Sequence, residues 1–138
     1  MTTETQIAPA RPSTPKAMFW TGWVLTILLV LLFLMGSVMA LTKNPQAVEG
    51  FKKYGYPEKS LMVLGIVELV CALLYVLPMT SVLGAILLTG YLGGAVATHV
   101  RAGEPFFFPI LFGIVVWLGL YFRDPRVRAL IPLRTFNS

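Results

Sequence analysis

An uncharged apolar block near the start of the chain limits the possible folds more than any other feature. Residues 18–41 read MFWTGWVLTILLVLLFLMGSVMAL and include no charged side chain. A helix of about 20 mostly apolar residues is long enough to cross a bilayer core of about 30 Å. A cleaved signal peptide has a shorter apolar run, so this block predicts a membrane-spanning helix.

Three further apolar blocks follow, and the charged residues lie almost entirely outside them. The expected spans are residues 18–41, 60–77, 81–100 and 106–122, and Glu68 is the one charged residue inside a span. Of all residues, 57% are hydrophobic and 12% are charged, and a water-soluble bundle of this composition would expose apolar faces. Because backbone polar groups in lipid must be satisfied within their own segment, each block is expected to be a helix.

Short links predict how these helices are connected. The turns at residues 77–81 and 102–105 are short, and links of this length join antiparallel neighbours. We therefore expect an all-α integral membrane protein, a four-helix bundle with up-down-up-down topology. Residues 17–130 would form this transmembrane domain, between a disordered N-terminal tail of residues 1–16 and a C-terminal tail of residues 131–138.

The longest link, residues 42–59, has a pattern of its own. Pro45 is followed by QAVEGFKKYG, and proline is favoured at the first position of a helix. We expect one or two helical turns here, lying in the membrane interface with Phe51, Tyr54 and Tyr56 facing lipid or the bundle.

The distribution of basic residues predicts the orientation. Six lie on the side that carries both termini, and five lie on the other side. The first group is Arg11, Lys16, Arg123, Arg126, Arg128 and Arg134, and the second is Lys43, Lys52, Lys53, Lys59 and Arg101. Since basic residues favour the cytoplasmic side, both termini are expected in the cytoplasm and the protein in the inner (plasma) membrane. The net charge of +5 is spread beside apolar spans, so it indicates a lipid bilayer and no nucleic acid as partner.

Glu68 is the first candidate functional residue, because it lies near the middle of the second span. A carboxylate at that depth is costly unless it is paired, protonated or hydrated. Its helical face should therefore turn inward, with Gly65 leaving room beside it and Tyr75 adding a polar edge. Two hypotheses stay open, a proton-transfer or ligand-binding group on one side and a link between helices on the other.

The third span supplies the other candidates. Gly90 and Gly94 have a small-xxx-small spacing that favours close approach of a neighbouring helix. His99 and Arg101 lie at the end of the span, where Arg101 can also serve as an interfacial anchor. Glu68 is about 12 Å along its own span and His99 about 3 Å from the end of its span, so direct contact is not expected. That separation indicates a small polar pocket open to one side.

Several kinds of chemistry find no support in the sequence. Cys71 is the only cysteine, so the chain has no internal disulfide and no CxxC motif. One histidine with Glu68 and Glu104 has no metal-ligand spacing, and no nucleophile or phosphate-loop motif is present. No cofactor can be named, and the motifs do not decide whether the protein is an enzyme.

Two segments in this order resemble the DoxX-like family of small four-helix membrane proteins. They are YGYPEKSLMVLGIVELVCALLYVLP, which contains Gly65 and Glu68, and YLGGAVATHVRAGEP, which contains Gly94 and His99. The resemblance extends over about residues 18–130. It implies the four-helix fold and a link to membrane oxidoreductases, because the family is named after a subunit of an archaeal thiosulfate:quinone oxidoreductase.

The expected function is therefore a DoxX-like membrane component that binds a small hydrophobic or quinone-like molecule or supports a membrane oxidoreductase complex. Its partner would be such a complex or another copy of the chain. Glu68 and His99 are the residues expected to matter most. A non-catalytic structural or assembly subunit is the alternative, and a small transporter is a further one, although one acid and no broken helix make a poor transport pathway.

Overall fold

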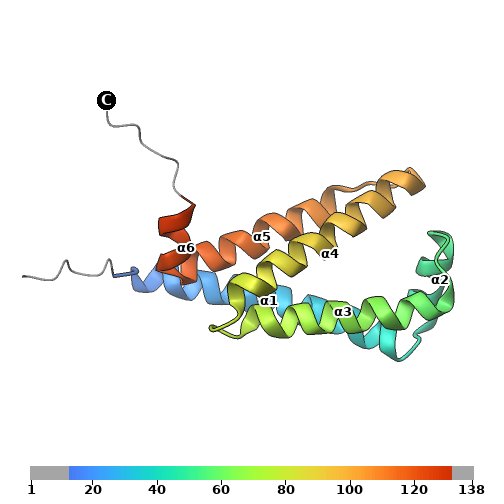
Figure 1. The fold of residues 1–138 in the computed structure, drawn as a ribbon, viewed down its shortest axis with the longest axis horizontal. Coiled ribbons are helices and arrows are strands. Elements are labelled where there is room, and N and C mark those ends of the chain that lie inside the picture. Colours follow the sequence, from blue (N-terminus) through green and yellow to red (C-terminus); the bar gives the residue numbers. More distant parts are fainter. Residues whose placement is uncertain (1–12, 132–138) are drawn as a thin grey trace, which may run out of the picture.

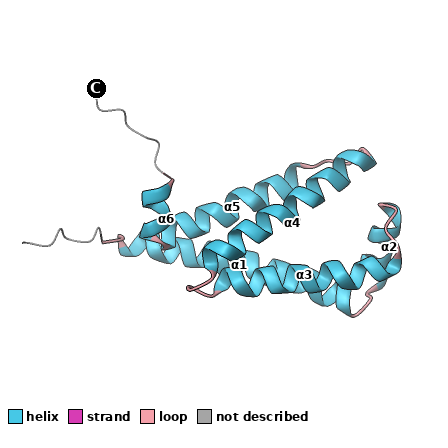
Figure 2. Cartoon of the chain, in the orientation of Figure 1, coloured by secondary structure: helices cyan, strands magenta, loops and turns pink. Residues whose placement is uncertain are grey.

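The computed structural model describes residues 13–131, and this part of the chain is helical with short links and no strand (Figure 2). The helices are α1 (Lys16–Leu41), α2 (Pro45–Lys53), α3 (Glu58–Val76), α4 (Ser81–Ala102), α5 (Phe107–Arg123) and α6 (Pro125–Leu130). The expected all-α class is confirmed. Both expected tails fall mainly outside the described residues, although α1 already begins at Lys16.

The four long helices pack in a ring. Helix α1 packs on α3 and α5, and α4 packs on the same two helices from the other side (Figure 1). The core between them is mostly apolar, and its fully buried side chains include Leu61, Leu88, Val116 and Leu120 together with the hydroxyl residues Thr26 and Ser37. Figure 1 shows that α4 diverges from α3 toward the end of the molecule where α2 lies.

Three of the long helices, α1, α3 and α4, have the length and apolar composition needed to cross a membrane. Helix α5 is apolar but shorter, with 17 residues. Most large apolar side chains on the outer faces of these helices are exposed, such as Leu28 (60%), Leu31 (57%) and Met35 (58%) on α1. Apolar surface of this extent indicates contact with lipid and not with water.

Close helix crossings in this fold depend on glycines. A Cβ atom at Gly22 on α1 would lie 2.7 Å from the backbone nitrogen of Arg123 on α5. A Cβ atom at Gly84 on α4 would overlap the backbone of Tyr75 on α3. At Gly65 on α3 the Cβ atom would lie 2.8 Å from the Cβ atom of Ala40 on α1. Only glycine permits these three pairs of helices to approach so closely.

The expected packing role of Gly90 and Gly94 is wrong within this chain. A Cβ atom at either position would meet no atom within 4 Å. The reason is the divergence of α4 from α3, which leaves both glycines beside open space. The close crossing of α4 lies instead nearer its start, at Gly84.

Two short helices connect or follow the long ones. The expected helical turns after Pro45 are present as α2, and the Asn44 side chain accepts a hydrogen bond from the backbone N–H of Gln46 at 3.0 Å. Helix α6 was not expected from the sequence. It begins in the same way, because Asp124 accepts a bond from the backbone N–H of Arg126 at 2.9 Å and Pro125 occupies the first turn.

Candidate functional site

A cavity of about 390 Å³ lies between α3, the diverging end of α4 and the segment that contains α2. Its lining is mostly aromatic and small: Phe51, Tyr54, Tyr56, Leu64, Val67, Gly90, Tyr91, Gly94, Ala95, Thr98 and His99. The two glycines that contact no other helix therefore form part of its wall. The backbone of α2 packs on α1 and α3, and only side chains close the space between α2 and α4.

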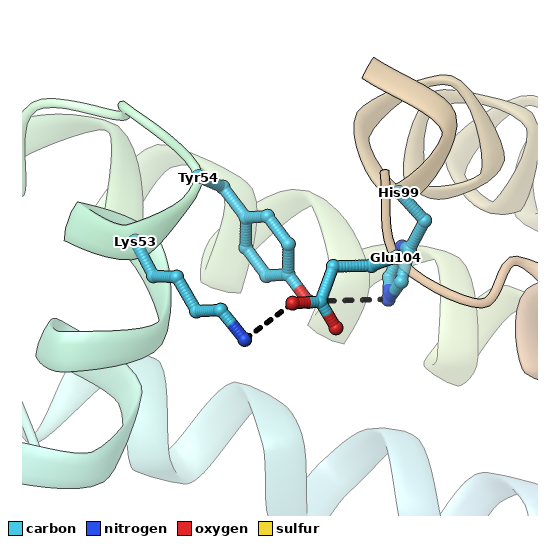
Figure 3. Close-up of polar contacts among 4 residues, drawn as sticks. All are labelled: Lys53, Tyr54, His99 and Glu104. Atoms are coloured by element: carbon cyan, nitrogen blue, oxygen red, sulfur yellow. Dashed lines mark hydrogen bonds and ion pairs between the residues drawn. The ribbon is translucent and has the colours of Figure 1, made fainter. Parts of the chain in front are cut away.

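Two pairs of polar side chains lie at the cavity wall between these segments. The Tyr54 hydroxyl lies 3.4 Å from His99 Nε2, and the Tyr56 hydroxyl lies 2.7 Å from Thr98 Oγ1 (Figure 3 shows the first pair). His99 Nδ1 is 2.7 Å from the carbonyl oxygen of Ala95. Because that oxygen can only accept, Nδ1 carries a proton, and in the tautomer with Nε2 unprotonated this atom accepts from the Tyr54 hydroxyl. His99 and these hydroxyls can therefore bind a ligand with polar oxygen atoms.

An ion pair and an arginine bridge the same two segments outside the cavity. Lys53 Nζ lies 2.5 Å from Glu104 Oε1 (Figure 3). The pairing lowers the pKa of Glu104 and raises that of Lys53, because each charge stabilises the other through a hydrogen bond and Coulomb attraction. Arg101 is exposed, donates to the carbonyl oxygen of Tyr54 at 2.8 Å, and lies over the Tyr56 ring. Arg101 thus holds the cavity wall and does not line the cavity.

Glu68 on α3 lies deeper, where its carboxyl meets side chains of both α1 and α4. Its carboxyl is next to the side chains of Ser37 and Tyr91, and a Cβ atom at Gly36 would lie 3.1 Å from its Oε1 atom. Within residues 13–131 no cation pairs with it, since the two ion pairs found there are Lys43–Glu58 and Lys53–Glu104. Glu68 does not line the cavity, but Tyr91 does. Tyr91 therefore separates the carboxyl from the space where a ligand would lie.

The expectation that Tyr75 adds a polar edge beside Glu68 is wrong. Tyr75 is 0% exposed, and its hydroxyl donates to the carbonyl oxygen of Val116 on α5 at 2.7 Å. Thr26 Oγ1 lies 3.5 Å from the same hydroxyl. Since the phenol is fully used in joining α3, α5 and α1, it is a core residue on the helix face that also carries Glu68.

A family model for the DoxX-like family matches residues 24–119, which is more than half of the chain. The chain belongs to the DoxX-like family. This membership together with the long apolar helices makes it a membrane protein. We find no match to the chain among curated proteins and none among solved structures.

Sequence reasoning missed two residues of the site in this DoxX-like protein. Tyr91 and Thr98 both line the cavity, and both lie in the segment YLGGAVATH. The spacing contained the signal, because Tyr91, Ala95 and His99 follow each other at intervals of four residues and so share a helix face. Read this way, the face that carries His99 also carries a phenol that can reach the Glu68 helix.

Proposed function

We propose that this DoxX-like protein crosses the plasma membrane four times and binds a small, flat, hydrophobic molecule of the quinone type in the cavity between α2, α3 and α4. The four spans would be α1, α3, α4 and α5, arranged up, down, up and down. Both termini would lie in the cytoplasm, as the six-to-five distribution of basic residues favours.

The single observation that carries this proposal is the chemistry of the cavity wall. A volume of about 390 Å³ is within the range of small-molecule sites, which are mostly apolar with a few fixed polar groups. Phe51 and Tyr56 have ring centroids 5.6 Å apart and offer aromatic faces. The Thr98 hydroxyl donates to the Gly94 carbonyl oxygen at 2.9 Å, so the Tyr54 and Tyr56 hydroxyls are the groups that would turn from His99 and Thr98 to donate to a quinone carbonyl oxygen. Two apolar glycine positions leave room for a ring.

The position of Glu68 supports the proposal that this protein assists the redox chemistry of a partner enzyme. Reduction of a quinone consumes protons, and a carboxyl near the middle of a span, such as that of the half-buried Glu68, is a common proton-transfer group. The Tyr91 phenol lies between that carboxyl and the cavity. We therefore infer that the protein supports a membrane oxidoreductase, with His99 and Tyr54 holding the ligand and Glu68 serving as a proton-holding group behind it.

Two leucine substitutions on α4 test the binding proposal. Gly94 lines the cavity and its Cβ direction is open, so Gly94→Leu should fill the space without disturbing helix packing. Gly93 is also open but lines a different, apolar groove facing α5, so Gly93→Leu is the matched control. A short-chain ubiquinone analogue should stabilise the wild type and Gly93→Leu proteins in detergent, and it should not stabilise Gly94→Leu. Equal stabilisation of all three proteins, or of none, would contradict the proposal.

A structural or assembly role is the second candidate, and the position of Glu68 favours it. The carboxyl contacts Gly36 and Ser37 of α1 and Tyr91 of α4. Hydrogen bonds between spans of this kind hold helices together without any chemistry. The two roles differ in what they require of Glu68, and the variants that separate them are described below.

A further inference from the structure

A second cavity, of about 380 Å³, lies at the opposite end of the helices from the first. It is bounded by the start of α1, the turn between α3 and α4, and the link between α5 and α6. Its lining is Phe19, Trp23, Pro78, Ser81, Leu120, Arg123, Asp124, Pro125 and Arg126. Unlike the first cavity, it contains two arginines and one carboxylate.

Arg123 is the central residue of this cavity, and it is held rigidly. It is only 7% exposed, and its guanidinium lies 4.8 Å from the Trp23 ring centroid and 4.9 Å from that of Tyr75. Its Nη2 atom donates to the carbonyl oxygen of Tyr75 at 2.6 Å. That carbonyl is in the last turn of α3, where no backbone N–H is available. One nitrogen of Arg123 therefore completes the end of α3.

Beyond these two rings and the Tyr75 carbonyl oxygen, the guanidinium has no hydrogen-bond or ion-pair partner among residues 13–131. Arg123 Nε is buried and its N–H donates to no neighbour, and neither ion pair found in those residues includes Arg123. An unpaired buried charge is costly. The helix-capping role accounts for the hydrogen bond of Nη2. It does not account for the unused Nε–H of Arg123, or for the placement of this cation in the wall of a cavity.

The surroundings of Arg123 favour a negative ligand. Arg126 is exposed and lines the same cavity, and Asp124, the only acid in the lining, already accepts from the Arg126 backbone. Ser81, at the first turn of the 22-residue helix α4, also lines the cavity, and the start of a long helix favours anions. Phe19 and Trp23 supply the aromatic side chains that are common at the level of lipid headgroups.

We propose that this cavity binds a phosphate group, with Arg123 and Arg126 as its two cationic contacts. The planar guanidinium matches the geometry of phosphate oxygens, which accept two parallel N–H bonds from it. The position at the ends of the spans fits the headgroup of an anionic phospholipid, and free phosphate ion has the same chemistry. The site is separate from the quinone-type cavity and does not depend on its ligand.

Retention of phosphatidylglycerol tests this proposal. Protein purified in a neutral detergent is mixed with phosphatidylglycerol or phosphatidylcholine, and bound lipid is counted by native mass spectrometry. Wild type protein should retain phosphatidylglycerol in preference to phosphatidylcholine. Arg126→Gln should weaken that retention about tenfold, the usual effect of losing a charge-assisted hydrogen bond. Arg101→Gln, an exposed arginine at the other end of α4, should leave retention unchanged.

Three further measurements test whether the second cavity binds phosphate. Arg123→Lys keeps the charge but loses the planar fork, so it should also weaken retention, and if it does not fold Arg126→Gln decides the result. Stabilisation of lipid-free protein by inorganic phosphate, compared with sodium chloride at equal ionic strength, would identify the free ion as a ligand. Gly94→Leu should retain phosphatidylglycerol normally. No preference for phosphatidylglycerol together with no effect of phosphate would overturn the proposal, as would wild type retention by Arg126→Gln.

Discussion

The ammonium group of Lys53 lies 2.5 Å from the Glu104 carboxylate and joins the end of α2 to the turn that follows α4. The backbone of α2 packs on α1 and α3 only. This ion pair, with Arg101 and the two tyrosine contacts, is therefore what connects the α2 segment to α4. Neither of its two residues lines the cavity.

Because of this ion pair, the stability of the α2 segment should depend on pH. Pairing lowers the pKa of Glu104 below its ordinary value of 4.5, so its stabilisation is present above that value and is lost as pH falls through the lowered pKa. Pairing raises the pKa of Lys53 above 10.5, so that contribution is complete below 10.5 and is lost at higher pH. Lys53→Gln should therefore increase amide hydrogen exchange in α2 at about pH 6, and this effect should shrink as the pH falls below the ordinary Glu104 value and through its lowered pKa. The neighbouring Lys52→Gln should have no effect, and equal changes in both variants would contradict the assignment.

Gly84 should tolerate no side chain. A Cβ atom there would overlap the Tyr75 backbone, and backbone atoms cannot move aside as a side chain can. We expect Gly84→Ala to destabilise the protein by about 3 kcal/mol, at the upper end for overpacking. Gly93→Ala, in open space on the same helix, should be neutral or stabilising by up to about 1 kcal/mol. Thermal unfolding in detergent measures both, and similar melting temperatures for the two variants would disprove the close crossing.

Two substitutions at Glu68 separate proton transfer from helix linkage. Glu68→Gln preserves the shape and most hydrogen bonds of a protonated carboxyl, so it should keep the wild type melting temperature. Glu68→Leu leaves the Tyr91 hydroxyl without its neighbour and should cost about 1–3 kcal/mol. We expect Glu68→Gln nevertheless to fail in restoring growth of a deletion strain under oxidative stress. Full restoration by Glu68→Gln would remove the proton-transfer role and favour the structural one.

Reporter fusions test the number of spans and the orientation. A reporter fused after Ser138 should be cytoplasmic, and one fused after Tyr54 should lie on the opposite side. Since three spans, α3, α4 and α5, would lie between Tyr54 and Ser138, the same side for both fusions would contradict four spans. A C-terminal reporter outside the cytoplasm would contradict only the orientation.

Much of the fold could be predicted from the positions of the uncharged segments in the sequence. The expected spans 18–41, 60–77, 81–100 and 106–122 each correspond to a long helix within two residues at either end, because ionisable groups and prolines mark the ends. Helix α6 was missed because its six residues, PRVRAL, are too few for a periodic pattern. The sequence also predicted that the face of Glu68 turns inward, and Leu61, Gly65 and Ala72 on that face are buried.

The candidate site was harder to predict, because helix periodicity gives faces but not distances between helices. Gly90 and Gly94 have the spacing of a packing motif, but α4 diverges from α3 before it reaches them. Tyr75 shares a face with Glu68, but it lies nearer the closed end of the helices, where its hydroxyl is taken by α5. His99 was placed correctly at a cavity wall, while its partner Tyr54 comes from a link whose position no periodic pattern specifies.

The angle at the close crossing of α3 and α4 determines how far apart the two helices are beyond it. Thr80 in the turn also donates to the carbonyl oxygen of Leu74 at 2.8 Å, which fixes the turn between these helices. Because His99 is about 22 Å further along α4 than Gly84, a tilt of ~5° about the crossing moves it by ~2 Å. The width of the cavity thus depends on the angle of a helix crossing at the far end of the molecule, and substitutions around Tyr75 are expected to change that width without altering the cavity lining.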